Sequence, residues 1–293
     1  MLTVPDRESS VTRGNTVDDA VVTGFGKEWS RFPQERLSSA ERRALFAQYF
    51  AVFPWSAVDP ETSIGADLGC GTGRWAIEAA PRAGRLHLDD ASAEALAVAR
   101  GNLAREGIPN VEFHHAEIGR LPFPDASLDF AYSLGVLHHV PDCDRALAAI
   151  VSKLKPGAPL LLYLYYNFEN RPYWFRTLWM VSDLLRRLVS RCPFWLRAFV
   201  ADIVAALVYW PLARSAALLE RLGRLPPAWP LAAYRHASFY TMRTDALDKL
   251  GTRIERRFSR AEISAMLDRA GMECVMFSDQ VPYWCVSARK HAG

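Results

Sequence analysis

An alternating glycine turn between a predicted strand and a predicted helix constrains this chain most. Residues 64–68 are apolar apart from Asp67, and Gly69, Gly71 and Gly73 follow at alternate positions. Glycine allows both a sharp turn and a close approach of the backbone to a ligand. The helix expected after Gly73 offers free N–H groups and the positive end of its dipole. The pattern predicts an α/β core whose glycine turn holds an anionic group.

The glycine pattern argues against two common ligands, a dinucleotide and a nucleoside triphosphate. A dinucleotide fingerprint needs G-x-G-x-x-G, and Arg74 occupies the place of the third glycine. No Gly-Lys-Ser or Gly-Lys-Thr occurs in the chain, so a nucleotide phosphate loop is absent.

Residues 66–73 (ADLGCGTG) resemble motif I of the class I S-adenosylmethionine-dependent methyltransferases of the bacterial small-molecule type. The resemblance implies a doubly wound, seven-stranded and mostly parallel Rossmann-like sheet with S-adenosyl-L-methionine as cofactor. In the family this loop holds the methionine end of the cofactor. The residues that it assigns to cofactor binding here are Asp67, Gly69, Cys70, Gly71 and Gly73.

A second predicted strand, residues 85–90, ends in two acids. Ser92 suits the N-cap of the helix that follows. A carboxylate at the end of a strand can accept hydrogen bonds from both hydroxyls of a ribose. By the resemblance, Asp90 and Ala91 bind the cofactor, whereas Asp89 takes a place that is usually apolar. The alternative is that both aspartates only end a strand.

A third predicted strand, residues 111–116, leads into a turn that contains two prolines. The resemblance implies that this turn binds adenine, with the Glu117 side chain accepting from the exocyclic amine and the Ile118 N–H donating to the ring. The family more often has Asp where this chain has Glu117. The alternative is a proline-rich surface turn.

A buried strand within residues 127–136 is predicted to deliver Ser133 and then His138 and His139 to the carboxyl end of the sheet. Ligands of open α/β sheets bind at that end. Histidine titrates near neutral pH, which suits a general base. We predict Ser133 as a cofactor-binding residue and the two histidines as catalytic; alternatively, the histidines form a wall of the cofactor pocket.

An aromatic cluster of Phe25, Trp29 and Phe32 precedes the first strand. A similar F-G-x-E-W stretch covers the cofactor cleft in related methyltransferases, so the resemblance assigns Trp29 to cofactor binding. Excluding water favours methyl transfer from a sulfonium. The alternative is that these rings staple the N-terminal helix to the core.

The composition fits one large α/β core with an elaboration. The chain has 293 residues, of which 50% are apolar, and its formal charge of +3 is too small to indicate nucleic-acid binding. Its five cysteines include no C-x-x-C pair and are odd in number, which argues against a zinc site or a disulfide framework. Since no secretory apolar core is visible near the start, we expect a cytoplasmic protein with no metal site.

A long insertion, residues 167–257, is rich in Trp, Leu and Arg. Residues 174–189 form a broad apolar helical face, and residues 198–210 are almost wholly apolar but contain Asp202 and end at Pro211. That run is expected to be too short for a transmembrane segment. The insertion is either a helical lid that forms the acceptor pocket or a basic amphipathic surface in peripheral contact with a membrane. Polar groups such as Asp248 either face an acceptor or act as turn and capping residues.

The end of the chain completes the core. A capping box at Ser259 predicts a helix over residues 260–270 that Gly271 ends, and the strand-like runs 273–277 and 284–288 match the last hairpin of the family. The expected division is a flexible tail (1–20), a cofactor-binding core (21–166), the insertion (167–257) and a closing segment (258–293).

These motifs predict in-line transfer of a methyl group from S-adenosylmethionine to an oxygen, nitrogen or carbon nucleophile. The expected partner is a small acceptor with an apolar or aromatic part, and no nucleic acid. Two alternatives stay open: another reaction on the same fold, or a membrane-surface methyltransferase that acts on a lipid or quinone-like acceptor. The sequence carries no feature that sets an oligomeric state.

Overall fold

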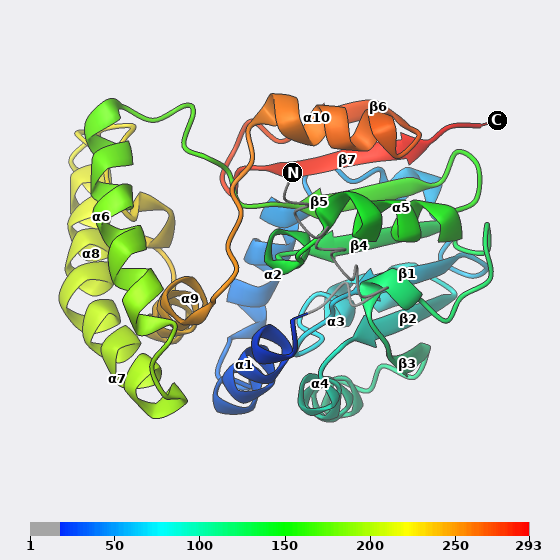
Figure 1. Ribbon diagram of the computed structural model, residues 1–293, viewed down its shortest axis with the longest axis horizontal. Helices are drawn as coiled ribbons and strands as arrows, with labels where there is room; N and C mark the ends of the chain where they lie inside the picture. The colour runs from blue at the N-terminus through cyan, green and yellow to red at the C-terminus, as the bar shows by residue number, and fades with distance from the viewer. Residues whose placement is uncertain (1–17, 293) are drawn as a thin grey trace, which may run out of the picture.

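The computed structural model describes residues 18–292 and has a seven-stranded sheet of order β3-β2-β1-β4-β5-β7-β6 (Figure 1). The first five strands pair in parallel, and β7 is antiparallel to both β5 and β6. This order confirms the predicted fold class. The strands are β1 (Ile64–Leu68), β2 (Arg85–Asp90), β3 (Val111–His115), β4 (Phe130–Leu134), β5 (Pro159–Tyr163), β6 (Met272–Phe277) and β7 (Cys285–Lys290).

Helices cover both faces of the sheet, because each face carries its own apolar cluster. One cluster joins the sheet to α5 and α10 and is centred on residues such as Ile150 and Ile263. The other joins it to α2, α3 and α4 through residues such as Phe46 and Leu96. These helices are α2 (Ser39–Tyr49), α3 (Ala76–Ala79), α4 (Ala93–Arg105), α5 (Cys143–Lys153) and α10 (Arg260–Arg269).

Local sequence signals set several helix ends. The Ser92 side chain accepts a hydrogen bond from the Ala95 N–H at 3.2 Å, which confirms the predicted N-cap of α4. Both bonds of the capping box between Ser259 and Glu262 are present at the start of α10. Gly271 follows that helix with a φ of +78°.

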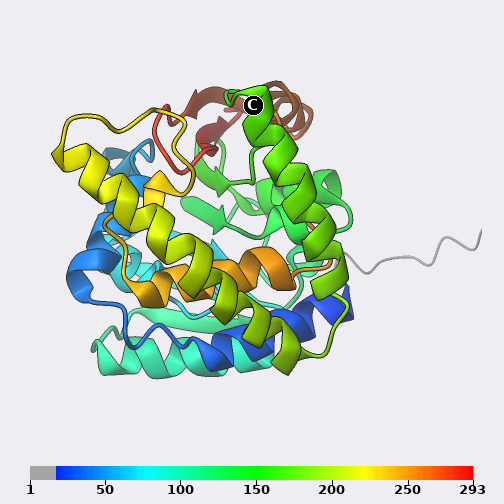
Figure 2. The ribbon, with the colours of Figure 1, turned by 90° about the vertical axis from the view of Figure 1, so that its left-hand side faces the viewer.

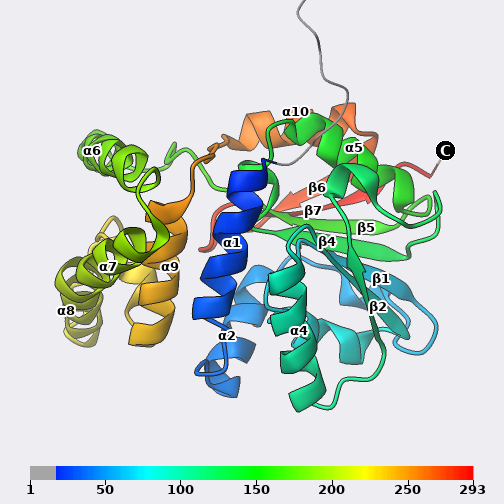
Figure 3. The same cartoon turned by 60° about the horizontal axis from the view of Figure 1, so that its bottom comes forward.

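The insertion folds as four helices that stand beyond the carboxyl edge of the parallel strands (Figure 1). They are α6 (Tyr173–Val189), α7 (Phe194–Val204), α8 (Trp210–Arg221) and α9 (Phe239–Gly251). Figure 3 shows α9 between the other insertion helices and α1 (Asp19–Arg31). A third apolar cluster joins Phe32, the residue that follows α1, to Ala201 of α7 and Leu247 of α9. The insertion is thereby packed on the N-terminal helix.

The expectation that Pro211 ends the apolar run is wrong. A single π turn, Ala205–Tyr209, joins α7 to α8, so one helix of 28 residues runs from Phe194 to Arg221. Proline lacks an N–H and clashes with the carbonyl four residues back in a regular α-helix. The wider hydrogen-bond pattern of a π turn relieves that conflict just before Pro211. By length and composition this helix could cross a membrane.

The start of the described chain is already helical. Asp18 caps α1 by accepting a hydrogen bond from the Ala20 N–H at 2.8 Å. The expected flexible tail of residues 1–20 therefore includes the first residues of a helix. Residues 1–17 of that tail lie outside the described residues.

Candidate functional site

The glycine turn after β1 has the geometry that only glycine accommodates easily. Gly69 has a φ of +76° and Gly71 a φ of +55°. A Cβ at Gly71 would lie 3.2 Å from the indole nitrogen of Trp29, and one at Gly69 would lie 2.5 Å from a Val136 methyl group. The turn thus lets α1 and the loop after β4 approach the backbone closely.

Gly73 has a different role from the one predicted. A Cβ at this position would lie 2.6 Å from a methyl group of Leu103, so the residue allows the turn to pack on α4. Gly73 is not among the residues that line the cavity next to the turn. We therefore assign it to packing between the turn and the helix.

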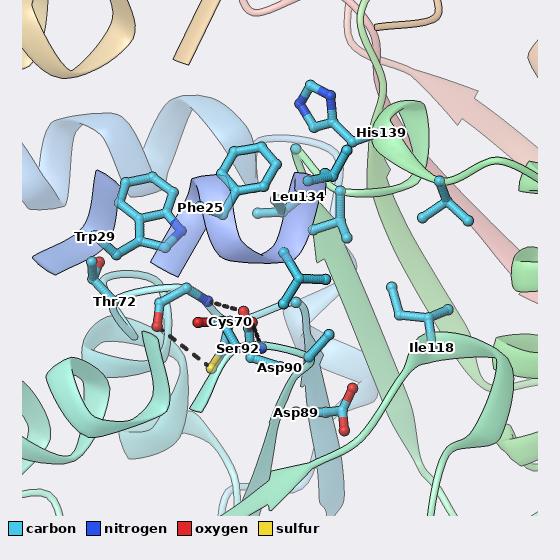
Figure 4. Close-up of a pocket in the computed structure, with 18 of the residues that line it drawn as sticks. Phe25, Trp29, Cys70, Thr72, Asp89, Asp90, Ser92, Ile118, Leu134 and His139 are labelled. Carbon is cyan, nitrogen blue, oxygen red and sulfur yellow. Dashed lines mark hydrogen bonds between the residues drawn. The ribbon is translucent and has the colours of Figure 1, made fainter. Parts of the chain in front are cut away.

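A cavity of about 870 Å³, counting the part that is open to solvent, lies between this turn and α1 (Figure 4). Its walls include Gly69, Cys70, Gly71, Asp90, Ala91, Ile118, Trp29 and His139, all of them predicted site residues. The walls also include Phe25, Thr72, Arg74, Trp75, Asp89, Ser92 and Val136. Within residues 18–292, none of the lining side chains comes from the insertion.

Asp90 faces the cavity and is anchored by backbone donors. Its Oδ2 accepts from the Gly71 N–H at 2.8 Å and its Oδ1 from the Ser92 N–H at 2.8 Å. Burial raises the pKa of this carboxyl, and the two backbone hydrogen bonds oppose the shift. A carboxylate has about four acceptor sites, so both oxygens keep capacity for further donors such as ribose hydroxyls.

Asp89 is a second acid of the cavity wall, and the sequence reasoning set it aside. Its side chain is fully buried, and neither carboxylate oxygen has a hydrogen-bond partner in the described part of the chain. Burial raises its pKa to about 8, and the neighbouring Asp90 and Asp67 add to the rise. The signal was present in the sequence as an acid at a position that the family usually fills with an apolar residue.

Besides Gly73, three predicted cofactor residues lie outside the cavity lining. The Asp67 carboxylate is buried behind the glycine turn, where it accepts from the Tyr132 hydroxyl at 3.1 Å, and burial raises its pKa to about 8. The Ser133 hydroxyl donates to the Leu68 carbonyl at 2.8 Å and so ties β4 to β1. Glu117 precedes Ile118, and only Ile118 reaches the cavity. These three residues do not line the cavity; they belong to the segments that hold its lining residues in place.

The three rings of the N-terminal aromatic cluster, Phe25, Trp29 and Phe32, have two different roles. The rings of Phe25 and Trp29 stack with centroids 6.3 Å apart and line the cavity opposite Asp89 and Asp90 (Figure 4). Phe32 instead packs edge-on against Tyr240 of α9, with centroids 5.6 Å apart. The covering role therefore fits Phe25 and Trp29, and the stapling role fits Phe32.

His139 is the histidine that reaches the cavity. Its Nδ1 lies 2.6 Å from the Ile254 carbonyl, which can only accept, so Nδ1 carries the proton and Nε2 keeps a lone pair. Nε2 has no hydrogen-bond partner among residues 18–292, and an oxygen of Asp248 lies 4.0 Å away. Burial lowers the pKa of His139, although Asp248 opposes the shift. The ring is therefore neutral near pH 7.

His138 does not reach the cavity, contrary to the prediction. Its side chain is fully buried, and its ring stacks on Tyr165 with centroids 3.8 Å apart. Burial lowers its pKa well below the ordinary value, and His139 adds to the drop. The short 3₁₀ turn Leu137–His139 directs the two neighbouring histidines differently. His138 is a packing residue.

The insertion reaches this histidine pair through Asp248 of α9. Its carboxylate accepts a hydrogen bond from the Tyr165 hydroxyl and lies beside His139. Burial raises the pKa of Asp248, and His139 opposes the rise. Among the polar groups that the sequence offered in this stretch, Asp248 is the one that supports the histidine.

A group of possible metal ligands lies apart from the cavity lining, on β2 and β3. His87, Glu112 and His114 each offer one ligand atom, and these atoms lie within 4.8 Å of one another. Parallel pairing of the two strands brings them together, which a search for short-range spacing cannot detect. Arg85 already pairs with Glu112 at 3.0 Å, so the negative charge of the Glu112 carboxylate is balanced by a side chain of the protein.

Comparisons with known proteins agree with the order of the motifs. Residues 66–157 match the family described as methyltransferase domain. Phosphoethanolamine N-methyltransferase 2 of Caenorhabditis elegans is 31% identical over 100 residues, which is 34% of this chain and 23% of that protein. Demethylmenaquinone methyltransferase of Listeria monocytogenes is 36% identical over 97 residues, which is 32% of this chain and 41% of that protein. The chain thus spans less than half the length of either curated relative.

The solved structures that are similar to this chain share less of its sequence. A SAM-dependent methyltransferase from Aquifex aeolicus is 14% identical, with a TM-score of 0.44, over 87% of this chain and 98% of that one. The part of this chain that matches the methyltransferase family is the segment that carries β1, the glycine turn and Asp90. Residues 66–157 therefore form a methyltransferase domain of the S-adenosylmethionine-dependent kind, and the sheet order and the cavity agree with that assignment.

Proposed function

We propose that the protein transfers a methyl group from S-adenosylmethionine to an oxygen, nitrogen or carbon nucleophile of a small, partly apolar or aromatic acceptor. The observation that carries this proposal is the cavity that the glycine turn, Asp90, Trp29 and His139 line together. Its walls combine aromatic rings with buried acids, which suits a ligand that is both apolar and cationic.

The residues of the cavity fit the cofactor chemically. When bound, S-adenosylmethionine supplies an electrophilic methyl group on a positively charged sulfur. Asp90 can accept from the ribose hydroxyls while its backbone bonds hold it in place. Arg74, on the same wall, can pair with the methionine carboxylate. The rings of Phe25 and Trp29 exclude water from the region around the turn.

His139 is the proposed general base. Its Nε2 keeps a lone pair and is buried without a protein partner, so it can take a proton from an acceptor hydroxyl or amine that reaches it from the cavity side of the ring. The Ile254 carbonyl holds the required tautomer, and Asp248 stabilises the imidazolium that forms. Most of the remaining rate enhancement would come from positioning of the two reactants.

The test is transfer of a tritiated methyl group from S-adenosylmethionine to demethylmenaquinone and to phosphoethanolamine. These probes are chosen because two relatives are named for them. With whichever probe is labelled, His139→Asn is expected to lower the transfer rate about 100-fold and to leave cofactor affinity unchanged. His291→Asn, on the exposed end of the chain, is the matched control. Full activity of His139→Asn would remove the assigned base, and a protein that binds no S-adenosylmethionine would overturn the proposed function.

A lipid or quinone-like acceptor is the favoured acceptor within this proposal. The insertion exposes many large apolar side chains, whereas the formal charge of the chain is only +3. A nucleic-acid substrate would call for a stronger basic surface. We also propose the cytoplasm as the compartment, supported by five cysteines that are all free thiols.

A further inference from the structure

The insertion has an apolar face that points away from the rest of the protein. It is formed by α6 and by the continuous helix α7–α8, which are the elements nearest the viewer in Figure 2. Six exposed side chains define this outward face: Leu178, Val181, Leu188, Trp195, Phe199 and Leu207. Soluble monomers rarely expose an apolar patch that extends along two helices.

The helix α6 is apolar on its exposed side and charged on its buried side. Trp174, Leu178, Val181, Leu185 and Leu188 recur every three or four residues and are all exposed. Asp183 and Arg186 turn inward, whereas Arg187 is exposed and its Nε donates to the Asp183 carboxylate at 2.8 Å. The buried Arg186 Nε donates to the buried Asp183 carboxylate at 2.8 Å, and another nitrogen of the same guanidinium donates to the Thr252 carbonyl at 2.8 Å.

The helix α7–α8 repeats this inverted pattern. Its buried residues are small, for Ala201, Ala205 and Ala213 are each fully buried. Its large side chains point outward, with Trp195 68% exposed and Leu207 72% exposed. Of its most apolar 18-residue window, only 28% is buried inside the protein. Small residues inside and large apolar residues outside are typical of helices that face lipid.

Charge complementarity indicates what covers this face. Residues 170–225 contain nine arginines and three acids, although the whole chain has a formal charge of only +3. Arg187 and Arg191 are exposed where α6 leads into α7, and Arg221 and Arg224 are exposed at the end of α8. Arginine near the ends of apolar helices suits an interface with anionic lipid headgroups, and exposed tryptophan suits the same depth.

We propose that the outward face docks on an anionic lipid bilayer, with α6 and α7–α8 lying in the plane of the interface. The proposal goes beyond the proposed function and does not depend on it. The apolar face would enter the boundary between headgroups and acyl chains while the arginines meet lipid phosphates.

The contacts of Asp202 show why the 28-residue helix lies on the bilayer and does not cross it. Two nitrogens of Arg243 donate to its carboxylate at 2.8 and 2.9 Å, and a nitrogen of Arg31 donates at 2.8 Å. These bonds tie α7 to α9 and to α1. Insertion across a membrane would break both pairs and leave the charges without partners.

The test is co-sedimentation of the full chain with vesicles that contain equal parts of phosphatidylglycerol and phosphatidylcholine, or phosphatidylcholine alone. We expect binding to the anionic vesicles and at least about tenfold weaker partition to the neutral ones. The double variant Phe199→Glu, Leu207→Glu is expected to lose at least about tenfold in partition to anionic vesicles. Met276→Glu on β6, also at an exposed apolar position, is the matched control and should bind as the wild type does.

Two further measurements distinguish loss of membrane binding from misfolding and from dimer formation. Far-UV circular dichroism should give the same spectrum for the wild type and both variants, which shows that the variants are folded whether or not the protein binds a cofactor. Light scattering without vesicles tests for a second copy of the chain as the occupant. A wild type that fails to bind anionic vesicles, or that forms a dimer which the double variant breaks without any vesicle binding, would overturn the proposal.

Discussion

Replacing Asp89 by Asn tests the electrostatics of the cavity wall. Asp89 is fully buried, and neither of its oxygens has a partner among residues 18–292. Its pKa rises from an ordinary value of 3.8 to about 8, chiefly because burial disfavours the charged form. Asparagine has nearly the same shape and cannot ionise. The substitution therefore removes the charge and leaves the packing in place.

The sign of the effect on stability follows from proton binding. Between pH 4 and pH 8 the unfolded chain has released the Asp89 proton, whereas the folded chain retains it. The folded state binds more protons in this window, so the contribution of Asp89 to stability falls as pH rises. One pKa unit corresponds to about 1.4 kcal/mol, which gives about 4 kcal/mol between pH 5 and pH 8 for a dry site. The adjoining cavity admits water, so we expect about 2 kcal/mol.

The assay is urea unfolding of the wild type and Asp89→Asn at pH 5 and pH 8, without cofactor. The free energy of unfolding of the variant should rise relative to the wild type by about 2 kcal/mol between the two pH values. Asp67, whose pKa is also raised to about 8, is present in both proteins, and its repulsion with Asp89 is part of the difference that the comparison measures. Asp268→Asn, at an exposed position on α10, is the control and should show no such change. A difference between Asp89→Asn and wild type that is the same at both pH values would refute the reasoning.

Three other substitutions, with a fourth as control, test the cofactor contact, the turn and a helix cap. Asp90→Ala should weaken S-adenosylmethionine binding about tenfold or more in calorimetric titration, with the unfolding midpoint little changed; unaltered affinity would remove the ribose assignment. Gly73→Ala should lower the free energy of unfolding by about 2 kcal/mol or more, because its Cβ would lie 2.6 Å from Leu103 at a φ of +72°. Gly101→Ala, inside α4 with open space around it, should instead gain about 0.5–1 kcal/mol in the same urea series. Ser259→Ala should cost about 1 kcal/mol through loss of the capping box, and no loss would contradict that role.

Features that depend on neighbouring residues in the sequence could be predicted. The N-cap at Ser92 and the capping box at Ser259 need only residues within one helical turn, and both are present. The sheet order followed from the resemblance around Gly69 and Gly71, because a βαβ core with this motif has few permitted topologies. Local signals therefore placed the strands, the cavity and Asp90 on its wall.

Features that depend on side-chain direction could not be predicted. His138 and His139 are adjacent, and only the short 3₁₀ turn decides that His139 faces the cavity while His138 packs on Tyr165. The role of Gly73 depends on Leu103 of a helix that begins many residues later. In each case a contact between distant segments selects among residues that look equivalent in the sequence.

The insertion shows a third kind of limit on sequence reasoning. Its apolar helical faces were visible, but periodicity alone does not say whether a face turns inward or outward. The buried pair Asp183–Arg186 and the fully buried Ala201 show that the polar and small residues face the protein. The π turn before Pro211 could not be foreseen either, since a proline usually ends or kinks a helix.

Calorimetric titration of S-adenosylmethionine into the full chain tests the central claim most directly, which is that the cavity between the glycine turn and α1 holds the cofactor. We predict one binding site per chain, with the affinity lowered about tenfold by Trp29→Ala because that ring closes the cavity over Gly71. The unfolding transition of the variant should stay cooperative. Absence of binding to the folded wild type, or binding that Trp29→Ala and Asp90→Ala both leave unchanged, would contradict the account.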